Sequence, residues 1–124
     1  MAKELQYTIT GEYQKGNSLK QTFGGIKNQV TVSGNVALAG VNSVGTSEEA
    51  IPLGEVTAAK AGMYAKNLDD TNYVEIRDAT GASNDVIYVP AGKDVFFYFG
   101  TDVTAPYWIA NTAAVLVEWR MYPN

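Results

Sequence analysis

The chain contains no cysteine and no histidine, and these two absences exclude several kinds of site. Without them, neither a Ser-His-Asp triad nor a Cys-His dyad can form. Zinc sites of the ordinary kind also need His or Cys ligands, so they are excluded as well. The lack of cysteine further means that no disulfide holds the fold, which is typical of a protein that folds in a reducing cytoplasm.

Basic charge is scarce and scattered along the chain. Nine Lys and Arg stand against thirteen Asp and Glu, which gives a net charge of −4 and a pI near 4.6. Binding to a phosphate backbone depends on clustered Lys and Arg, and the sequence contains no such cluster. We therefore expect no nucleic-acid partner.

Long apolar runs are missing too. No segment approaches the roughly 18 consecutive apolar residues of a membrane helix, so we expect no membrane partner. The opening residues, MAKELQYTIT, lack the apolar core of a secretory signal. The length of 124 residues fits one domain, and a hydrophobic content of 46% supports a folded core and excludes general disorder.

What the sequence does contain is alternation of apolar and polar residues with a period of two. Leu5, Tyr7 and Ile9 alternate with polar neighbours, and short alternating segments recur up to residue 122 between turns rich in Gly, Asn and Asp. Residues 56–70 have Ala and Lys enough for a helix, but a glycine interrupts them and no 3.6-residue period is sustained. The pattern predicts an all-β fold, an antiparallel β-sandwich of jelly-roll-like type.

The last alternating segment, residues 113–122, is also the longest. Val115, Val117 and Trp119 share one of its faces, so we predict that Trp119 is a core residue. Along the whole chain, the sequence divides into an N-terminal strand or arm region, residues 1–29, and a β-sandwich domain, residues 30–124. Together they are expected to count as a single domain.

The most polar stretch is NLDDTNYVEI, residues 67–76. Residues 69–72, Asp-Asp-Thr-Asn, carry oxygen atoms of the kind that bind Ca²⁺, but the spacing of a calcium loop is absent. Asp and Asn also close turns by accepting hydrogen bonds from nearby backbone N–H groups. We therefore expect a hairpin-like turn between strands at 62–68 and 72–78, and no metal site.

Two pairs of carboxylates are candidates for acid–base chemistry: Glu48 with Glu49, and Asp78 with Asp85. Nothing in the sequence sets either pair at the separation that such chemistry needs, so we favour exposed loop roles. The glycine pair in TFGGIKN lacks the Lys-Ser and the helix that follow a phosphate-binding loop. We expect no catalytic residue and no cofactor, and hence no enzyme.

Aromatic residues crowd the second half of the chain. In DVFFYF, residues 94–99, four consecutive aromatic side chains must point alternately to the two faces of one strand. One set can fill a core, and the other needs cover from a second layer, a neighbouring subunit or a flat ligand such as a sugar ring. Because exposed aromatic residues favour interfaces, we take as interface candidates Phe97, Phe99, Tyr107 and Trp108.

Four segments together resemble small virion proteins of tailed phages, including capsid cement (decoration) proteins. In order along the chain they are GTSEEAIPLGEV, AGMYAKNLDDTNYVEI, PAGKDVFFYF and APYWIANTAAVLVEWRMY. The group has an acidic loop after Gly-Thr, an NLDxTNYVxI turn, an AGxxxxF turn and a final strand of the T-A-x-L-E-aromatic kind. The resemblance covers roughly residues 30–124, and it holds turns and core positions only, so no functional site carries over.

The resemblance implies a β-sandwich module that assembles as an oligomer on a shell. It points to a capsid cement or decoration protein, most simply a homotrimer that binds the major capsid protein on the capsid surface after synthesis in the host cytoplasm. Two alternatives stay open: a tail or head–tail connector component, and a carbohydrate-binding β-sandwich module that uses exposed Tyr and Trp.

Overall fold

A computed structural model describes residues 5–17, 19–30, 38–54, 56, 62–81, 86–100 and 102–122. These residues form β-strands and no helix, so none of them belongs to a helix that could cross a membrane. The strands are β1 (Leu5–Tyr13), β2 (Gln21–Val30), β3 (Leu38–Val44), β4 (Glu49–Ala50), β5 (Gly62–Asn67), β6 (Val74–Arg77), β7 (Val86–Val89), β8 (Asp94–Tyr98), β9 (Tyr107–Ala110) and β10 (Val115–Tyr122). The predicted all-β class is confirmed.

The chain divides into two compact units, residues 1–32 and residues 33–124. The first unit contains β1 and β2, which pair with each other in an antiparallel two-stranded sheet. The second unit contains the remaining strands. The division lies close to the boundary that the sequence predicts between residues 29 and 30.

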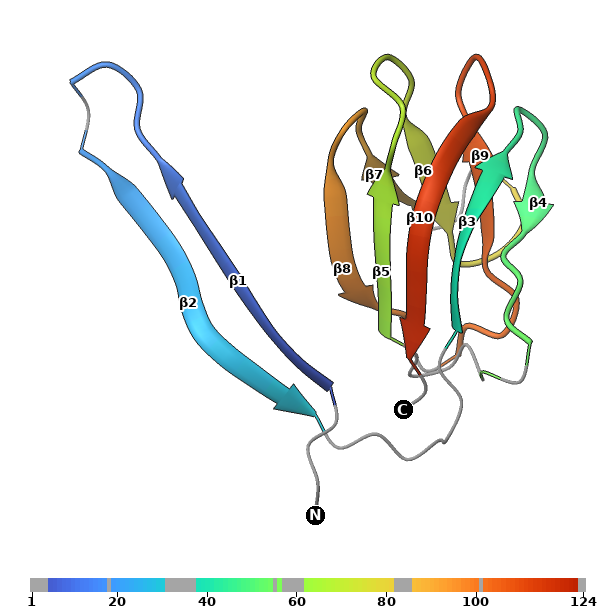
Figure 1. Cartoon of the computed structure of the whole chain (residues 1–124), viewed down its shortest axis with the longest axis horizontal. Coiled ribbons are helices and arrows are strands. Elements are labelled where there is room, and N and C mark those ends of the chain that lie inside the picture. The colour runs from blue at the N-terminus through green and yellow to red at the C-terminus, as the bar shows by residue number, and fades with distance from the viewer. Residues whose placement is uncertain are drawn as a thin grey trace. The chain divides into compact units, whose positions relative to one another are not determined.

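The second unit is a sandwich of two antiparallel sheets, and in Figure 1 the sheet with β8, β5, β10 and β3 lies in front of the sheet with β7, β6, β9 and β4. The first sheet has the strand order β3-β10-β5-β8, and the second has the order β4-β9-β6-β7. Almost every connection crosses from one sheet to the other, and only β6 and β7 are both consecutive in sequence and paired. This strand order is that of a jelly roll, so the predicted architecture is confirmed.

The core lies between the inner faces of the two sheets. Alternation along β10 turns Val115, Val117, Trp119 and Met121 inward, and all four side chains are buried. Trp119 is 4% exposed, packs edge-to-face against Trp108 at a ring-centroid distance of 6.2 Å, and donates its Nε1–H to Oδ1 of Asn42 at 2.7 Å. The prediction that Trp119 is a core residue is confirmed.

In the first unit, the glycine pair of TFGGIKN forms a β-bulge. The register between β1 and β2 shifts between Thr8 and Thr10, where β2 carries an extra residue. Gly24 has a φ of 78°, and a Cβ on it would collide with the backbone carbonyl of Ile9. Glycine is therefore required there by close backbone approach, which is a structural use of the motif.

Candidate functional site

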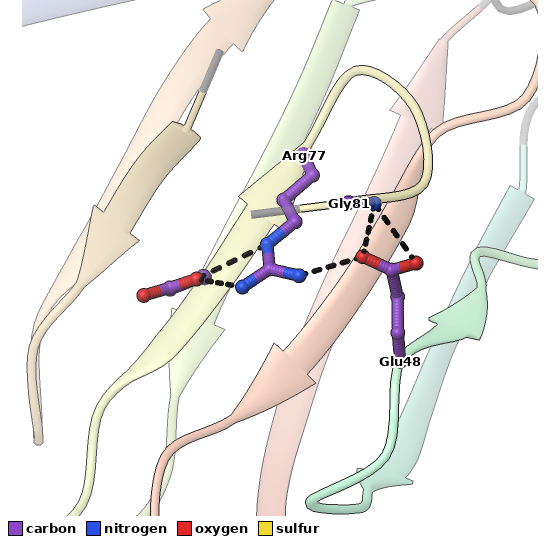
Figure 2. A network of polar contacts seen from close by, with 4 residues as sticks. Glu48, Arg77 and Gly81 are labelled. Carbon is purple, nitrogen blue, oxygen red and sulfur yellow. Dashed lines mark hydrogen bonds and ion pairs between the residues drawn. The ribbon is translucent and has the colours of Figure 1, made fainter. Parts of the chain in front are cut away.

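Arg77 lies at the centre of a polar cluster on the outer face of the second sheet (Figure 2). Its Nε and Nη2 both donate to Oε2 of Glu75, at 3.1 and 2.6 Å, and its Nη1 donates to Oε2 of Glu48 at 2.6 Å. The backbone N–H of Gly81 donates to both carboxylate oxygens of Glu48, at 3.2 and 2.9 Å. The cluster thus ties the segment before β4 to the segment after β6.

The same contacts fix the charge states of the cluster. Hydrogen bonding from the Gly81 backbone, followed by that from Arg77, holds the pKa of Glu48 below its ordinary value of 4.5. Hydrogen bonds to Glu48 and Glu75 raise the pKa of Arg77. A carboxylate held ionised by such partners is poorly suited to exchange protons near neutral pH, where a general acid or base needs a matched pKa. The arrangement suits a clamp that orders two loops.

The other predicted carboxylates do not join Glu48 in an acid–base pair. Oε2 of Glu49 accepts a hydrogen bond from the backbone N–H of Gly45 at 3.2 Å. Both residues therefore hold loop backbone; Glu49 is exposed as expected, whereas Glu48 is half-buried. Oδ1 of Asp78 is buried and has no hydrogen-bond partner among the residues that the structure describes, and Asp85 lies outside those residues.

Two tyrosines stand beside the cluster on the same face. Tyr73 and Tyr88 form an edge-to-face pair with ring centroids 5.3 Å apart, and Tyr88 lies opposite Glu75 across the strands. The negative charge of Glu75 raises the pKa of Tyr88. The adjacent hollow of about 190 Å³ is lined by Thr46, Tyr73, Glu75, Arg77, Ile109, Ala110 and Asn111. A tyrosine ring beside a carboxylate and a guanidinium is a combination that can hold a small polar ligand.

The outer face of the first sheet forms a second aromatic surface. Phe96 and Tyr98 point outward from β8, and their rings meet edge-to-face at a centroid distance of 5.5 Å. Tyr64 lies opposite Phe96 and donates its hydroxyl to Oδ2 of Asp94 at 3.2 Å. Burial, followed by this hydrogen bond, raises the pKa of Tyr64. A Cβ at Gly62 would lie 3.3–3.4 Å from the rings of Tyr98 and Phe96, so glycine permits their close packing there.

The turn after β5 is held by its own polar side chains. Oδ2 of Asp69 accepts hydrogen bonds from the backbone N–H groups of Thr71 and Asn72, at 3.0 and 2.6 Å. These bonds, that from Asn72 first, hold the pKa of Asp69 below its ordinary value of 3.8. The predicted turn is confirmed, but it is not a hairpin, because β5 and β6 belong to different sheets.

Asn67 is the buried anchor of this turn. It is fully buried, and its Oδ1 accepts from the Asp69 N–H at 2.8 Å. Its Nδ2 donates to the backbone carbonyls of Asn72 and Val89, at 2.8 and 3.0 Å. One amide thereby joins the first sheet, the turn and β7 of the second sheet.

No family model matches the chain, and no curated protein matches it. Among solved structures, the chain is similar to a protein of Bacillus endospore appendages, which are described as a novel family of disulfide-linked pili. The TM-score is 0.45 at 9% sequence identity, over 99% of this chain and 94% of that one. A similarity of this size carries no argument about function.

Three of the four candidate interface residues face the interior. Phe97 packs against the core, Phe99 is 7% exposed and Trp108 is 1% exposed, so these side chains present little surface to a partner. Tyr107 alone points outward, half-buried, opposite Arg77.

The reason for this correction is the register of β8. Phe97 pairs with Met63, which is buried, and this pairing turns the set that contains Phe97 inward. Phe96 and Tyr98 form the outward set. The alternation in DVFFYF indicated that one set would be outside, but it could not say which one.

Proposed function

We propose that this chain is a structural virion protein of a tailed phage, a capsid cement or decoration protein that stabilises the head shell from outside. It binds the major capsid protein and forms a homo-oligomer, most simply a trimer. This proposal rests on the resemblance of residues 30–124 to such proteins and on one observation in the structure. That observation is the partly exposed aromatic surface on the outer face of the first sheet.

The outer face of the first sheet mixes apolar with charged side chains. Antiparallel sheets with one solvated face ordinarily carry polar residues on it. Here Tyr98 is exposed together with Val41 and Leu116, and all three belong to the outer face of the first sheet. These apolar side chains lie among the charged Lys66, Asp94, Glu118 and Arg120 of the same face, and apolar residues with a polar surround are typical of a face that a partner protein covers. The Arg77 cluster, which braces loops with engaged carboxylates, is equally suited to a structural role.

The test is to add the purified chain to phage heads that lack it and to locate it by electron microscopy. We expect density on the outer shell, and greater resistance of the heads to heat or low salt. The double variant Leu116→Ser with Tyr98→Ser should lose binding, whether this face contacts the capsid directly or joins the copies of the oligomer that binds, whereas Tyr88→Ser on the second sheet should keep it. Density at the tail or the portal vertex would favour a tail or head–tail component, and no binding to any particle would refute the proposal.

A carbohydrate-binding module is the second candidate function. The observation that favours it is the Tyr73–Tyr88 pair next to the hollow beside Glu75 and Arg77. Titration with neutral oligosaccharides, followed by tyrosine resonances in NMR, tests it. Shifts that saturate and disappear in Tyr88→Ala would support this function, and unchanged spectra at millimolar sugar would exclude it for the sugars tried.

A further inference from the structure

The two-stranded sheet of the first unit is amphipathic. Alternation along β1 places Leu5, Tyr7, Ile9 and Tyr13 on one face and Gln6, Thr8, Thr10 and Glu12 on the other. Phe23 on β2 lies over Gly11, because a Cβ on Gly11 would collide with its ring, so Phe23 belongs to the apolar face. We refer to Leu5, Tyr7, Ile9, Tyr13 and Phe23 as the arm face.

The arm face has no second layer within its own unit. Ile9, Tyr13 and Phe23 are 48%, 57% and 61% exposed. An isolated two-stranded hairpin is marginally stable in water and needs packing against a further layer. An apolar face about 30 Å long, at about 3.4 Å per residue over β1, therefore requires a partner surface.

The charges of the two units are opposite. Residues 1–32 carry four Lys and two Glu, a net charge of +2. Residues 33–124 carry five Lys and Arg against eleven Asp and Glu, a net charge of −6. Such complementarity accelerates encounter between the first unit and the second, and it disfavours contact between two copies of the second unit.

We propose that the arm face of one copy docks on the outer face of the first sheet of a second copy. That outer face supplies exposed Val41, Tyr98 and Leu116, with partly exposed Tyr64, Phe96 and Tyr122. Its central strand, β10, has eight residues and so spans about 27 Å, close to the length of the arm face. The apolar arm face and this mixed face, which also carries Lys66, Asp94, Glu118 and Arg120, can pack at the usual separation of about 10 Å.

A second copy is the fitting partner because one chain encodes both surfaces. Donor and acceptor differ, so the contact is heterologous: each copy gives its arm to one neighbour and receives an arm from another. The rotation between neighbours decides whether such a contact closes into a ring, of which a trimer is one solution, or continues as a filament. The five side chains of the arm face would bury on the order of 500 Å² per side, given about 150–250 Å² for a fully buried aromatic. A single contact is therefore smaller than the roughly 800 Å² per partner of a standard stable interface, and in a closed ring each copy would bury about 1,000 Å² over its two contacts. This inference does not depend on a place in a virion.

Self-association of the full chain is the first test. Light scattering after size exclusion at about 10–100 μM should give a multiple of the 13.4 kDa chain mass. The donor variant Ile9→Ser with Phe23→Ser and the acceptor variant Leu116→Ser with Tyr98→Ser should each be monomeric. Matched controls on the other faces, Thr8→Ala with Thr10→Ala and Tyr88→Ser, should assemble as the parent does. Circular dichroism shows whether each variant keeps its β-structure.

Mixing the two defective variants is the decisive test. The donor variant keeps an intact acceptor, and the acceptor variant keeps an intact arm, so the mixture should form a one-to-one dimer that cannot grow. A mixture that stays monomeric, or a parent that is monomeric up to 100 μM, would overturn the proposal and indicate docking within one chain. If Tyr88→Ser fails to assemble and the Leu116/Tyr98 variant assembles, the arm docks on the second sheet and the proposed acceptor face is wrong. If the acceptor pair misfolds, Tyr98→Ser alone, at an exposed position, replaces it.

Discussion

The hairpin of the first unit and the jelly roll of the second are built from the same alternating pattern, yet only the second unit encloses a core. In the jelly roll, the inward residues of β10 meet the inward residues of the opposite sheet, as Trp119 meets Trp108. In the hairpin, Ile9 and Phe23 share a face that has no opposite sheet in the same unit. Alternation therefore indicates that one face of a sheet is apolar. Whether that face is buried within its own unit depends on whether the unit has a second sheet to pack against it.

The largest difference between the units should appear on truncation of a large aromatic side chain. Trp119→Ala should lower the free energy of unfolding of the second unit by about 3–5 kcal/mol, because it leaves a cavity in the core and leaves Asn42 without its donor. Tyr13→Ala in the hairpin should change the free energy of unfolding by less than about 0.5 kcal/mol, as is usual for an exposed position. Urea unfolding, followed by tryptophan fluorescence, measures the free energy of unfolding of Trp119→Ala and of Tyr13→Ala. In Trp119→Ala, Trp108 remains as the fluorescent probe. Equal losses would contradict the division into a self-sufficient and a dependent unit.

The next effect concerns the polar anchor of the jelly roll. Asn67→Ala should cost about 2–4 kcal/mol, because the backbone carbonyls of Asn72 and Val89 lose a buried donor and such groups cost about 1–3 kcal/mol each when unpaired. Asp70→Ala, in the same turn but exposed, is the matched control and should cost less than about 0.5 kcal/mol. Thermal and urea unfolding of both variants would test the point. An Asn67→Ala protein as stable as the control would mean that the turn holds without its anchor.

Acid should act on the second unit through the Arg77 cluster. The pKa of Glu48 is lower in the folded protein than its ordinary value of 4.5, so the stability that this carboxylate contributes is present above pH 4.5. It is lost as the pH falls from 4.5 through the folded pKa. Glu48→Gln should therefore be less stable than the parent near neutral pH and should lose less stability on acidification.

The control for this experiment is Glu49→Gln, which removes the same charge from the neighbouring position. Its pH profile measures the effect of removing a carboxylate that has no contact with Arg77 in the described structure. Chemical unfolding at several pH values between pH 5 and pH 3 gives both profiles. Parallel pH profiles for Glu48→Gln and the parent would show that Glu48 does not stabilise the protein through the Arg77 cluster.

The smallest effect on folding should come from removing the arm altogether. A chain that lacks residues 1–29 should keep the free energy of unfolding of the second unit within about 0.5 kcal/mol, since the core residues of the sandwich all belong to residues 33–124. Its self-association should nevertheless be lost. If the truncated chain fails to fold, the arm is part of the second unit's stability and the comparison between the units no longer holds.

The features that depend on near neighbours could be predicted from the sequence. The turn at residues 69–72 follows from side chains that bond the backbone two or three residues away, as Asp69 does. The turn in PAGK is also local. Gly92 has a φ of 71°, and the backbone N–H of Lys93 donates a hydrogen bond to the Pro90 carbonyl. The all-β class and the inward position of Trp119 follow from a period of two residues, which is also local.

The candidate site and the path of the chain depended on partners far apart in sequence. Arg77 meets Glu48 across 29 residues, and Asn67 meets Val89 across 22. The same holds for β8, where alternation separates Phe96 from Phe97 but only the pairing with Met63 sends Phe97 inside. A local pattern determined which residues share a face and where the chain turns. Only the pairing of distant strands decided which face became core and which was left for a partner, because burial is a property of the assembled layers.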